Sequence, residues 1–342
     1  MSYNIGMKRI LLCLLATALL FASGCTNTAD TAEASGEYYA LDTICTQHVI
    51  GGDAQAAAQE VSAMLTRITN EMSMNEGSDL YAVNSAAPQS AEVSEETADV
   101  LAQALSLAAL TNGAFDPTIG PVSALWDISG DPRVPSAEEL AAAVPLVDYT
   151  GVTLSGTTVT LAKAGMKIDL GGIGKGYAAD LAGQIYEKYG VKSALLNLGG
   201  NIFVYGSKED GSDYRIGLRD PYGEDNDFFA IIPASNTSVV TSGIYERYFV
   251  QDGVTYHHLF DPQTGYPADN GLAAVTVVCQ HSTKADALST ALFVMGLDKG
   301  LAFAQGLDGV EAIFITTDKK VYATDGIKEI IEITNESYIL QG

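Results

Sequence analysis

Positively charged residues are scarce in this 342-residue sequence, in which 18 lysines and arginines face 42 aspartates and glutamates. The formal net charge is −24. Proteins that bind nucleic acids meet the phosphate backbone with clustered Lys and Arg, so this imbalance argues against a nucleic-acid partner. An anionic ligand must therefore be held by local means, such as a metal ion, backbone N–H groups at a helix start, or a single lysine.

Cysteine and histidine are also rare, with four of each. Neither Cys45 nor Cys279 has a C-x-x-C partner, and two outcomes stay open for this pair. They form a disulfide outside the cytoplasm, or they are two buried free thiols. His257 and His258 are adjacent, but a transition-metal site made of histidine alone needs a third ligand, and the sequence does not indicate one.

The apolar segment near the N-terminus is too short to span a bilayer comfortably. It follows Lys8 and Arg9 and ends in Ala-Ser-Gly-Cys25, which resembles a bacterial lipobox. We interpret residues 1–24 as a lipoprotein signal peptide and residues 25–36 as a flexible tether from a lipidated Cys25. This interpretation predicts a lipid anchor on the extracytoplasmic face of the bacterial cell membrane. An ordinary secretory signal and a membrane anchor are the alternatives.

Apolar periodicity predicts several helices, and some begin at recognisable caps. Asp53 is a candidate cap for a helix over residues 53–73, and Ser94 begins a second helix that ends near residue 112. Further helices are expected at residues 136–144, 175–190 and 284–296. Residues 38–50 are typical of a first strand, and short strands fill much of the chain after residue 150. Early helices and later antiparallel strand pairs predict an α+β fold.

Residues 169–180, DLGGIGKGYAAD, place four glycines and Lys175 between Asp169 and a predicted helix. Gly176 follows the lysine where a P-loop needs Ser or Thr, and the G-x-G-x-G spacing does not match the dinucleotide-binding fingerprint. A loop without Cβ atoms lets a ligand approach the backbone at the start of a helix. We therefore favour a ligand-contacting loop over a simple strand-to-helix turn.

Asp286 and Thr290 are four residues apart on a predicted helix, so they lie on the same face. A carboxylate and a hydroxyl there can give a hard cation two oxygens, with a loop carbonyl as a third. Taken alone, an aspartate this close to a helix start is more typical of helix capping than of a metal site. His257, His258 and Asp261 suggest acid–base chemistry, although Asp261 also suits the cap of a DPQTG turn.

Residues 112–126 contain an aromatic residue followed by an acidic one, Phe115-Asp116, directly before Pro117. The proline restricts the aspartate to extended geometry, so its carboxylate is a fixed acceptor beside a ring face. Taken alone, this stretch is typical of a loop.

Five stretches, in this order, resemble the ApbE family of bacterial FAD:protein FMN transferases, whose members are often lipoproteins. They are GAFDPTIGP, IDLGGIGKGYAAD, LLNLGGNIFVYG, TSGIYERYF together with HHLFDPQTGYP, and DALSTALFVMG. The resemblance covers essentially the whole mature chain, and we assign residues 37–342 to one ApbE-like domain. It implies a T-fold-like α+β domain with mixed, mostly antiparallel sheets, flanking helices, and FAD in a cleft between two lobes.

The resemblance also implies a reaction: with Mg2+, the FAD pyrophosphate is broken, FMN is placed on a threonine hydroxyl of an acceptor flavoprotein, and AMP is released. By family analogy, the acceptor is a subunit of a redox pump or of an extracytoplasmic electron-transfer system. Physically this is phosphoryl transfer, in which positioning and charge neutralisation do most of the work.

Matching the motifs assigns roles to individual residues of this chain. Gly174, Asp286 and Thr290 are implied to hold the metal, and Lys175 to lie at the phosphates. His258 is the implied proton-handling group, steadied by Asp261. The residues implied to contact FAD or to orient its loop are Leu41, Asn75, Ala114, Phe115, Asp116, Asp169, Lys175 and Phe260.

The sequence departs from the family pattern at two positions. Gly174 replaces a common alanine, which is harmless if only the carbonyl is used. Asn75 stands where many members carry an aromatic residue that could stack on the ligand. This change leaves a metal-dependent FAD pyrophosphatase, with FMN and AMP as products, as one alternative. A non-catalytic FAD-binding lipoprotein is the other.

Overall fold

The computed structural model describes residues 31–224 and 226–342. The predicted signal peptide, Cys25 and the first part of the tether lie outside these residues. Within the described ranges, no helix combines the length and the apolar character needed to cross a membrane.

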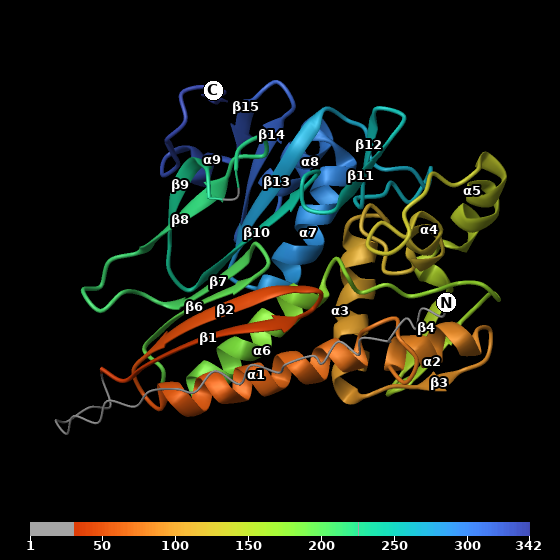
Figure 1. The fold of residues 1–342 in the computed structure, drawn as a ribbon, viewed down its shortest axis with the longest axis horizontal. Helices are drawn as coiled ribbons and strands as arrows, with labels where there is room; N and C mark the ends of the chain where they lie inside the picture. Colours follow the sequence, from red (N-terminus) through yellow and green to blue (C-terminus); the bar gives the residue numbers. More distant parts are fainter. Residues whose placement is uncertain (1–30, 225) are drawn as a thin grey trace, which may run out of the picture.

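The centre of the fold, in the described residues, is a nine-stranded sheet in the order β1-β2-β6-β7-β10-β13-β14-β15-β17 (Figure 1). Its neighbouring strands pair antiparallel, except for the parallel pair β15 and β17. The bounds are β1 Glu33–Ala40, β2 Thr43–Ile50, β6 Ser193–Leu198, β7 Asn201–Gly206, β10 Thr237–Gly243, β13 Leu272–Cys279, β14 Val310–Thr316, β15 Lys320–Ala323 and β17 Ile339–Leu340. The expected α+β class with mostly antiparallel sheets is confirmed.

Smaller sheets in the described residues lie around this one. A sheet in the order β16-β9-β8 packs against the main sheet, with Phe229 and Ile232 in the shared core. The hairpin β11–β12 packs beside α4 and α5 (Figure 1). The bounds are β3 Ala91–Glu92, β4 Val152–Ser155, β5 Thr158–Leu161, β8 Tyr214–Arg219, β9 Phe228–Ala234, β11 Tyr248–Gln251, β12 Val254–His257 and β16 Glu332–Ile333.

The long helices begin where the sequence predicts. Asp53 accepts a hydrogen bond from the Ala56 N–H, and Ser94 accepts one from the Thr97 N–H, as N-caps do. Four helices, α2, α4, α8 and α9, were not expected from the sequence. The helix bounds are α1 Ala54–Glu71, α2 Asp79–Ala86, α3 Glu95–Leu110, α4 Gly120–Trp126, α5 Ala137–Ala143, α6 Gly174–Lys188, α7 Ser282–Met295, α8 Leu297–Gln305 and α9 Asp325–Lys328.

The N-terminal strand differs from the prediction in two ways. The expected single strand over residues 38–50 is a hairpin, because Leu41 and Asp42 both adopt positive φ and reverse the chain. Strand β1 also begins at Glu33, inside the segment predicted to be a tether. The Glu33 end of this strand pairs with Ile50, so residues 33–36 belong to the sheet.

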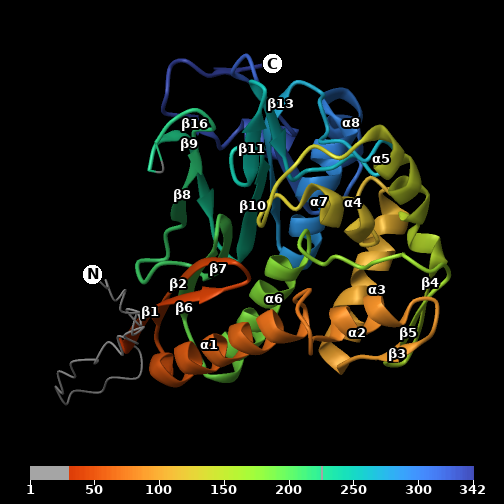
Figure 2. The same cartoon turned by 45° about the vertical axis from the view of Figure 1, so that its right-hand side comes forward.

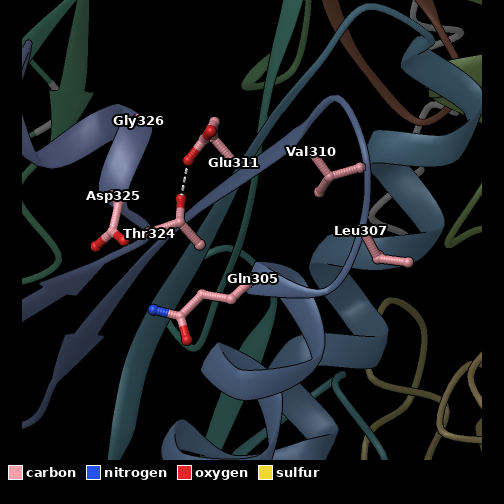
Figure 3. Close-up of a pocket in the computed structure, with 7 residues that line it drawn as sticks. All are labelled: Gln305, Leu307, Val310, Glu311, Thr324, Asp325 and Gly326. Carbon is pink, nitrogen blue, oxygen red and sulfur yellow. Dashed lines mark hydrogen bonds between the residues drawn. The ribbon is translucent and has the colours of Figure 1, made fainter.

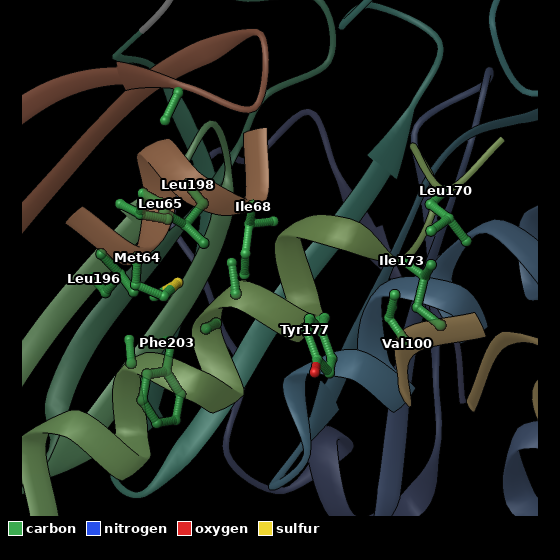
Figure 4. Packing of buried hydrophobic residues seen from close by; sticks show 14 of the residues in the cluster. Met64, Leu65, Ile68, Val100, Leu170, Ile173, Tyr177, Leu196, Leu198 and Phe203 are labelled. Atoms are coloured by element: carbon green, nitrogen blue, oxygen red, sulfur yellow. The ribbon is translucent and has the colours of Figure 1, made fainter. Parts of the chain in front are cut away.

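The largest core lies between the sheet and the helices α1, α3 and α6 (Figure 2). Figure 4 shows α6 residue Tyr177 near Val100, with α1 side chains meeting strand β6 on the other side. Leu170 and Ile173, which precede or cap α6, are buried in the same core. Burial of these two side chains fixes the glycine-rich loop between them. Cys45 and Cys279 are buried and unpaired, so the free-thiol alternative holds.

Candidate functional site

The site is built where α6 crosses α7. The Gly176 N–H donates to Asp286 Oδ2 at 2.8 Å, and the Asp286 side chain is 5% exposed. A Cβ atom on Gly176 would lie 2.3 Å from the Ser282 carbonyl oxygen. Glycine is therefore required for the two helices to approach closely enough to make this bond.

The start of α7 is also held by α6. Both oxygens of the Asp180 carboxylate accept backbone hydrogen bonds, from Ser282 N at 2.8 Å and from Thr283 N at 2.9 Å. A helix cap supplied by a neighbouring helix fixes the position of α7, and hence of Asp286, relative to the loop.

Lys175 approaches the second oxygen of the Asp286 carboxylate. Its Nζ lies 3.8 Å from Asp286 Oδ1 and 3.5 Å from the Gly171 carbonyl oxygen. The sequence-predicted residues Lys175 and Asp286 are thus brought together, with the ammonium group directed toward oxygen atoms of the loop and of α7.

Thr290 belongs to a chain of hydroxyl groups. Ser242 Oγ lies 2.8 Å from Ser289 Oγ and 3.4 Å from Thr290 Oγ1. Ser289 Oγ donates to the Asp286 carbonyl oxygen at 2.8 Å. Ser242 and Ser289 were not identified from the sequence. Their contact requires β10 to lie next to α7, and this arrangement depends on the order of the strands in the sheet, which local sequence patterns do not reveal.

The glycine-rich loop is shaped by Asp169, whose carboxylate accepts from Gly171 N at 2.9 Å and from Ser123 Oγ at 2.7 Å. A Cβ on Gly172 would lie 3.3 Å from the Phe115 ring and 3.5 Å from Thr290 Oγ1. Gly174 is the first residue of α6, and no atom lies within 4 Å of its Cβ position. The Cβ position of Gly172 is thus the one beside Thr290, while the proposed role of the Gly174 carbonyl stays a prediction.

The segment before α4 brings Phe115 next to this loop, as the Gly172 distance indicates, with Ala114 half-buried beside it. Asp116 is 7% exposed, and its carboxylate accepts from Thr118 N at 2.8 Å, Thr118 Oγ1 at 2.6 Å and Tyr149 N at 3.1 Å. Burial raises the pKa of Asp116, and these hydrogen bonds oppose the increase. Asp116 thus ties this segment to residue 149.

Leu41 and Asn75 lie in turns near the C-terminal end of α1. The Leu41 N–H donates to Thr69 Oγ1 of α1 at 2.9 Å. Asn75 is exposed in the turn between α1 and α2, and its N–H donates to Ser73 Oγ at 3.3 Å. The turn is linked to the segment before the glycine-rich loop, since Asn84 contacts both Met74 and Ile168.

The His258 side chain is half-buried and forms a hydrogen bond with the backbone at Arg247. Its Nδ1 lies 3.2 Å from the Arg247 carbonyl oxygen, which can only accept, so Nδ1 carries the proton and Nε2 is left as an acceptor. Burial lowers the pKa of His258 to about 3, with Arg247 and Lys175 acting in the same direction. The imidazole is therefore neutral at pH 7.

The predicted pairing of His258 with Asp261 is not formed among the described residues. Asp261 Oδ1 accepts from Gln263 N at 2.9 Å, which is the turn-capping role left open by the sequence. Phe260 is 8% exposed and stacks on Trp126 with ring centroids 5.7 Å apart. The side chains of both residues are thus engaged in the local fold.

Glu246 and Arg247, in the turn between β10 and β11, are further charged residues near the site that sequence reasoning missed. Both side chains are exposed. Glu246 Oε1 lies 3.8 Å from the Cβ position of Gly200, in the β6–β7 turn. The surrounding protein atoms raise the pKa of Glu246 to about 7, while Lys175 lowers it and Asp286 raises it.

The donors gathered here suit a hard divalent cation. Asp286 offers a buried carboxylate, Thr290 a hydroxyl, and the loop backbone oxygens, which are the ligands that Mg2+ and Ca2+ prefer. The Lys175 ammonium already lies at one of these oxygens, so the position attracts positive charge. No cluster of three or more His, Cys, Asp or Glu side chains in the described ranges is arranged for a metal, so backbone and hydroxyl oxygens would have to complete the set.

The described residues also form two pockets, neither of which is lined by Lys175, Asp286 or Thr290. One, with a volume of about 340 Å3, lies between α8, β14 and α9, where the Thr324 hydroxyl bonds Glu311 (Figure 3). The other, of about 570 Å3, is lined by residues of α3 and α6, including Asp99 and Glu187.

Comparison with known proteins identifies relatives over most of the length. A family model described as the ApbE family matches residues 41–314. The FAD:protein FMN transferase of Treponema pallidum is 35% identical, with 97% of each chain covered. The ApbE protein of Thermotoga maritima superposes with a TM-score of 0.82 at 36% identity, covering 87% of this chain and 99% of that one.

A histidine-to-glycine mutant of the flavin transferase ApbE from Vibrio cholerae superposes with a TM-score of 0.76 at 30% identity, covering 87% of this chain and 99% of the other. The family model and these relatives each cover most of the chain. The chain belongs to the ApbE family.

Proposed function

We propose that this protein is an FAD:protein FMN transferase, which moves FMN from FAD to a threonine hydroxyl of an acceptor flavoprotein and releases AMP. The observation that carries the proposal is the buried Asp286 carboxylate, held against the glycine-rich loop with Lys175 beside it. The names of the relatives at 35% identity support the same reaction.

The reaction needs a nucleophile, a proton acceptor and stabilisation of the leaving phosphate. The acceptor hydroxyl loses its proton to Nε2 of the neutral His258 as its oxygen bonds to the FMN phosphorus. The bond from that phosphorus to the bridging oxygen breaks, and AMP leaves with the electron pair. Lys175, at the start of α6, neutralises charge on the phosphate oxygens together with the N-terminal backbone amides.

Asp286, Thr290 and a backbone oxygen of the 172–174 loop would hold Mg2+. A bound Mg2+ supplies charge neutralisation at the pyrophosphate. Asp169 keeps the loop in place through Gly171, and Phe115 provides an apolar wall beside Gly172. Each of these side chains thus binds or orients a group, and His258 moves the proton.

The substitution Asp286→Asn tests the metal site. The amide oxygen of Asn can still accept from Gly176 N–H, so the fold is kept, but the charge that would hold Mg2+ is lost. We expect Mg2+-dependent AMP release from FAD to fall by roughly 100-fold or more. Chromatography of the nucleotides measures it, with Asp298→Asn, an exposed acid of α8, as the control. Wild-type turnover in Asp286→Asn would remove the metal from the mechanism.

A pyrophosphatase is the second candidate, and Asn75 is the observation that favours it. This exposed side chain stands where an aromatic ring could stack on the ligand, so water can replace the acceptor hydroxyl. Incubation with FAD, Mg2+ and a threonine-bearing acceptor domain separates the two, because only the transferase leaves covalent fluorescence on the acceptor in a denaturing gel. Rapid AMP release without label would establish hydrolysis instead.

The place of action is proposed from the sequence signal. A lipid on Cys25 would hold the domain at the extracytoplasmic face of the cell membrane, where flavoprotein subunits of redox pumps or electron-transfer systems are the proposed acceptors. The short apolar segment, the preceding Lys8 and Arg9 and the lipobox-like residues support this proposal.

A further inference from the structure

The segment LLNLGGNIFVYG, residues 195–206, supplies none of the groups assigned to the proposed reaction. Asn197 Oδ1 accepts from the Gly200 N–H at 2.8 Å and so holds the turn between β6 and β7. Strand β7 then begins at Asn201, a polar residue that is only 1% exposed. The segment thus places a buried amide at the first residue of β7.

This amide is bonded to the start of α7. The hydroxyl of Ser282, the buried first residue of α7, donates to Asn201 Oδ1 at 3.2 Å. Asp180 of α6 accepts from the backbone N–H groups of Ser282 and Thr283. The first turn of α7 is therefore attached on two sides, to helix α6 through its backbone and to strand β7 through a side chain.

Ser282 lies one helical turn before Asp286, so the two residues share a face of α7. This face meets α6, because the Cβ position of Gly176 lies 2.3 Å from the Ser282 carbonyl oxygen and 2.7 Å from Asp286 Cβ. A helix end held only by its terminal N–H groups can still turn about the helix axis. A bond to a side chain of the first turn opposes that rotation, and so helps to fix the direction of the Asp286 carboxylate.

Stability alone does not account for an asparagine at position 201. Among the described residues, its Nδ2 atom has no hydrogen-bond partner, although the atom is buried. A buried polar atom without a partner destabilises a fold. Replacing both members of a buried hydrogen-bonded pair by apolar groups of similar shape is, by contrast, nearly neutral or stabilising. Polar groups that break this rule are expected at functional sites.

We propose that Asn201 is a positioning residue, which acts through Ser282 to hold Asp286 in the orientation that binds a divalent cation. This inference rests on the proposed metal site and adds to it a role for residues 195–206. Asn201 touches neither the cation nor the nucleotide, and its effect passes through the first turn of α7.

The test measures metal affinity and stability on the same variants of the full chain. Electron paramagnetic resonance follows the binding of Mn2+ alone, and urea unfolding without metal gives the stability. Ser282→Ala removes a single oxygen, and Asn201→Leu replaces the amide with an apolar group of the same branching. We expect each variant to bind Mn2+ roughly threefold to tenfold more weakly than the wild type.

The double variant Asn201→Leu/Ser282→Ala separates positioning from stability. Both changes break the same bond, so the double variant should bind Mn2+ no more weakly than the weaker of the two single variants. It leaves neither partner of the bond behind, so it should unfold at the wild-type urea concentration or a higher one.

Asn270→Leu is the matched control, because the Asn270 side chain holds the opposite end of α7, with Nδ2 donating to the Phe293 carbonyl oxygen at 2.6 Å. It should lower the urea midpoint and leave Mn2+ affinity unchanged. Wild-type affinity in Ser282→Ala, a double variant of clearly lower stability, or an equal weakening of binding in Asn270→Leu would overturn the positioning role alone. Equal Mn2+ binding by the wild type and Asp286→Asn would overturn the proposed metal site and this inference together.

Discussion

The role of each side chain in the site depends on its hydrogen bonds more than on its residue type. Two adjacent histidines illustrate this: His258 has its Nδ1 on a carbonyl oxygen, whereas His257 Nδ1 accepts from Leu259 N at 3.3 Å. His257 is 8% exposed and lies edge-on to Phe293 of α7. His257 therefore has a structural role, whereas its neighbour His258 is the proposed proton acceptor.

His257 predicts how stability depends on pH. Burial lowers its pKa to about 4, below the value near 6.5 in an unfolded chain. Its stabilising contribution is therefore present above pH 6.5 and is lost as the pH falls toward 4, because only the unfolded chain takes up the proton. We expect the free energy of unfolding to drop between pH 7.5 and pH 5, by on the order of 2 kcal/mol from this residue.

Urea unfolding of wild type and His257→Asn at the two pH values measures this contribution. Asn keeps an acceptor for Leu259 N–H but does not titrate, so the variant should lose less stability on acidification. An equal pH dependence in both proteins would assign the effect to other groups.

Individual residues also mark where sequence reasoning succeeded and where it ended. Asp286 and Thr290 were placed on one helix face because a spacing of four is a local property. Ser242 and Glu246 were not found, because they join the site through β10, whose neighbours in the sheet come from distant parts of the chain. Asp261 had two readings from the sequence, and only its contacts distinguish them.

At the scale of elements, the crossing of α6 and α7 decides whether the site exists. Both helices were expected, since each has a glycine-marked end and apolar periodicity. Their contact was not, because it depends on the absence of a Cβ at one position. Helix α4 was missed because it is short and begins with Gly120-Pro121, residues that are typical of turns.

The two glycines at the start of α6 predict opposite effects of the same substitution. In Gly176→Ala, the new Cβ would meet the Ser282 backbone at 2.3 Å, so α6 and α7 must separate. We expect a loss of about 1–3 kcal/mol and reduced metal affinity. In Gly174→Ala no atom lies within 4 Å, so stability should be unchanged or higher by up to about 1 kcal/mol.

Chemical denaturation of the two variants in parallel gives the comparison. Since both changes add one methyl group to the same helix, differences in helix propensity are controlled. Similar stabilities for the two variants would contradict the close helix contact at Gly176.

At the scale of the whole molecule, the sequence predicts the fold class but not the order of the strands in the sheet. The short strand-like segments and the apolar periodicity of the helices indicated the α+β fold class. The family resemblance indicated mostly antiparallel sheets. The strand order β7-β10-β13-β14 could not be derived from local pattern, because strand neighbours are chosen by long-range packing. The hairpin turn at Leu41-Asp42 was hidden as well, since neither residue is the glycine usual at positive φ.

The proposed lipid anchor concerns the whole molecule and has its own test. In a bacterial host that expresses the full chain with a labelled fatty acid, Cys25→Ser should carry no label and should leave the membrane fraction. Cys13→Ser, within the same predicted signal, should remain labelled. Label on Cys25→Ser, or its loss from Cys13→Ser, would contradict the lipobox interpretation.

The chain has one tryptophan, Trp126, which is fully buried among aromatic rings that include Tyr256 at 5.3 Å and Phe260 at 5.7 Å. Tyr256 and Phe260 flank His258 in sequence. A single indole therefore emits beside the segment that carries His258, and a flavin absorbs in the range of that emission. Nucleotide docking can thus be followed by quenching of the protein's own fluorescence, with no dye attached.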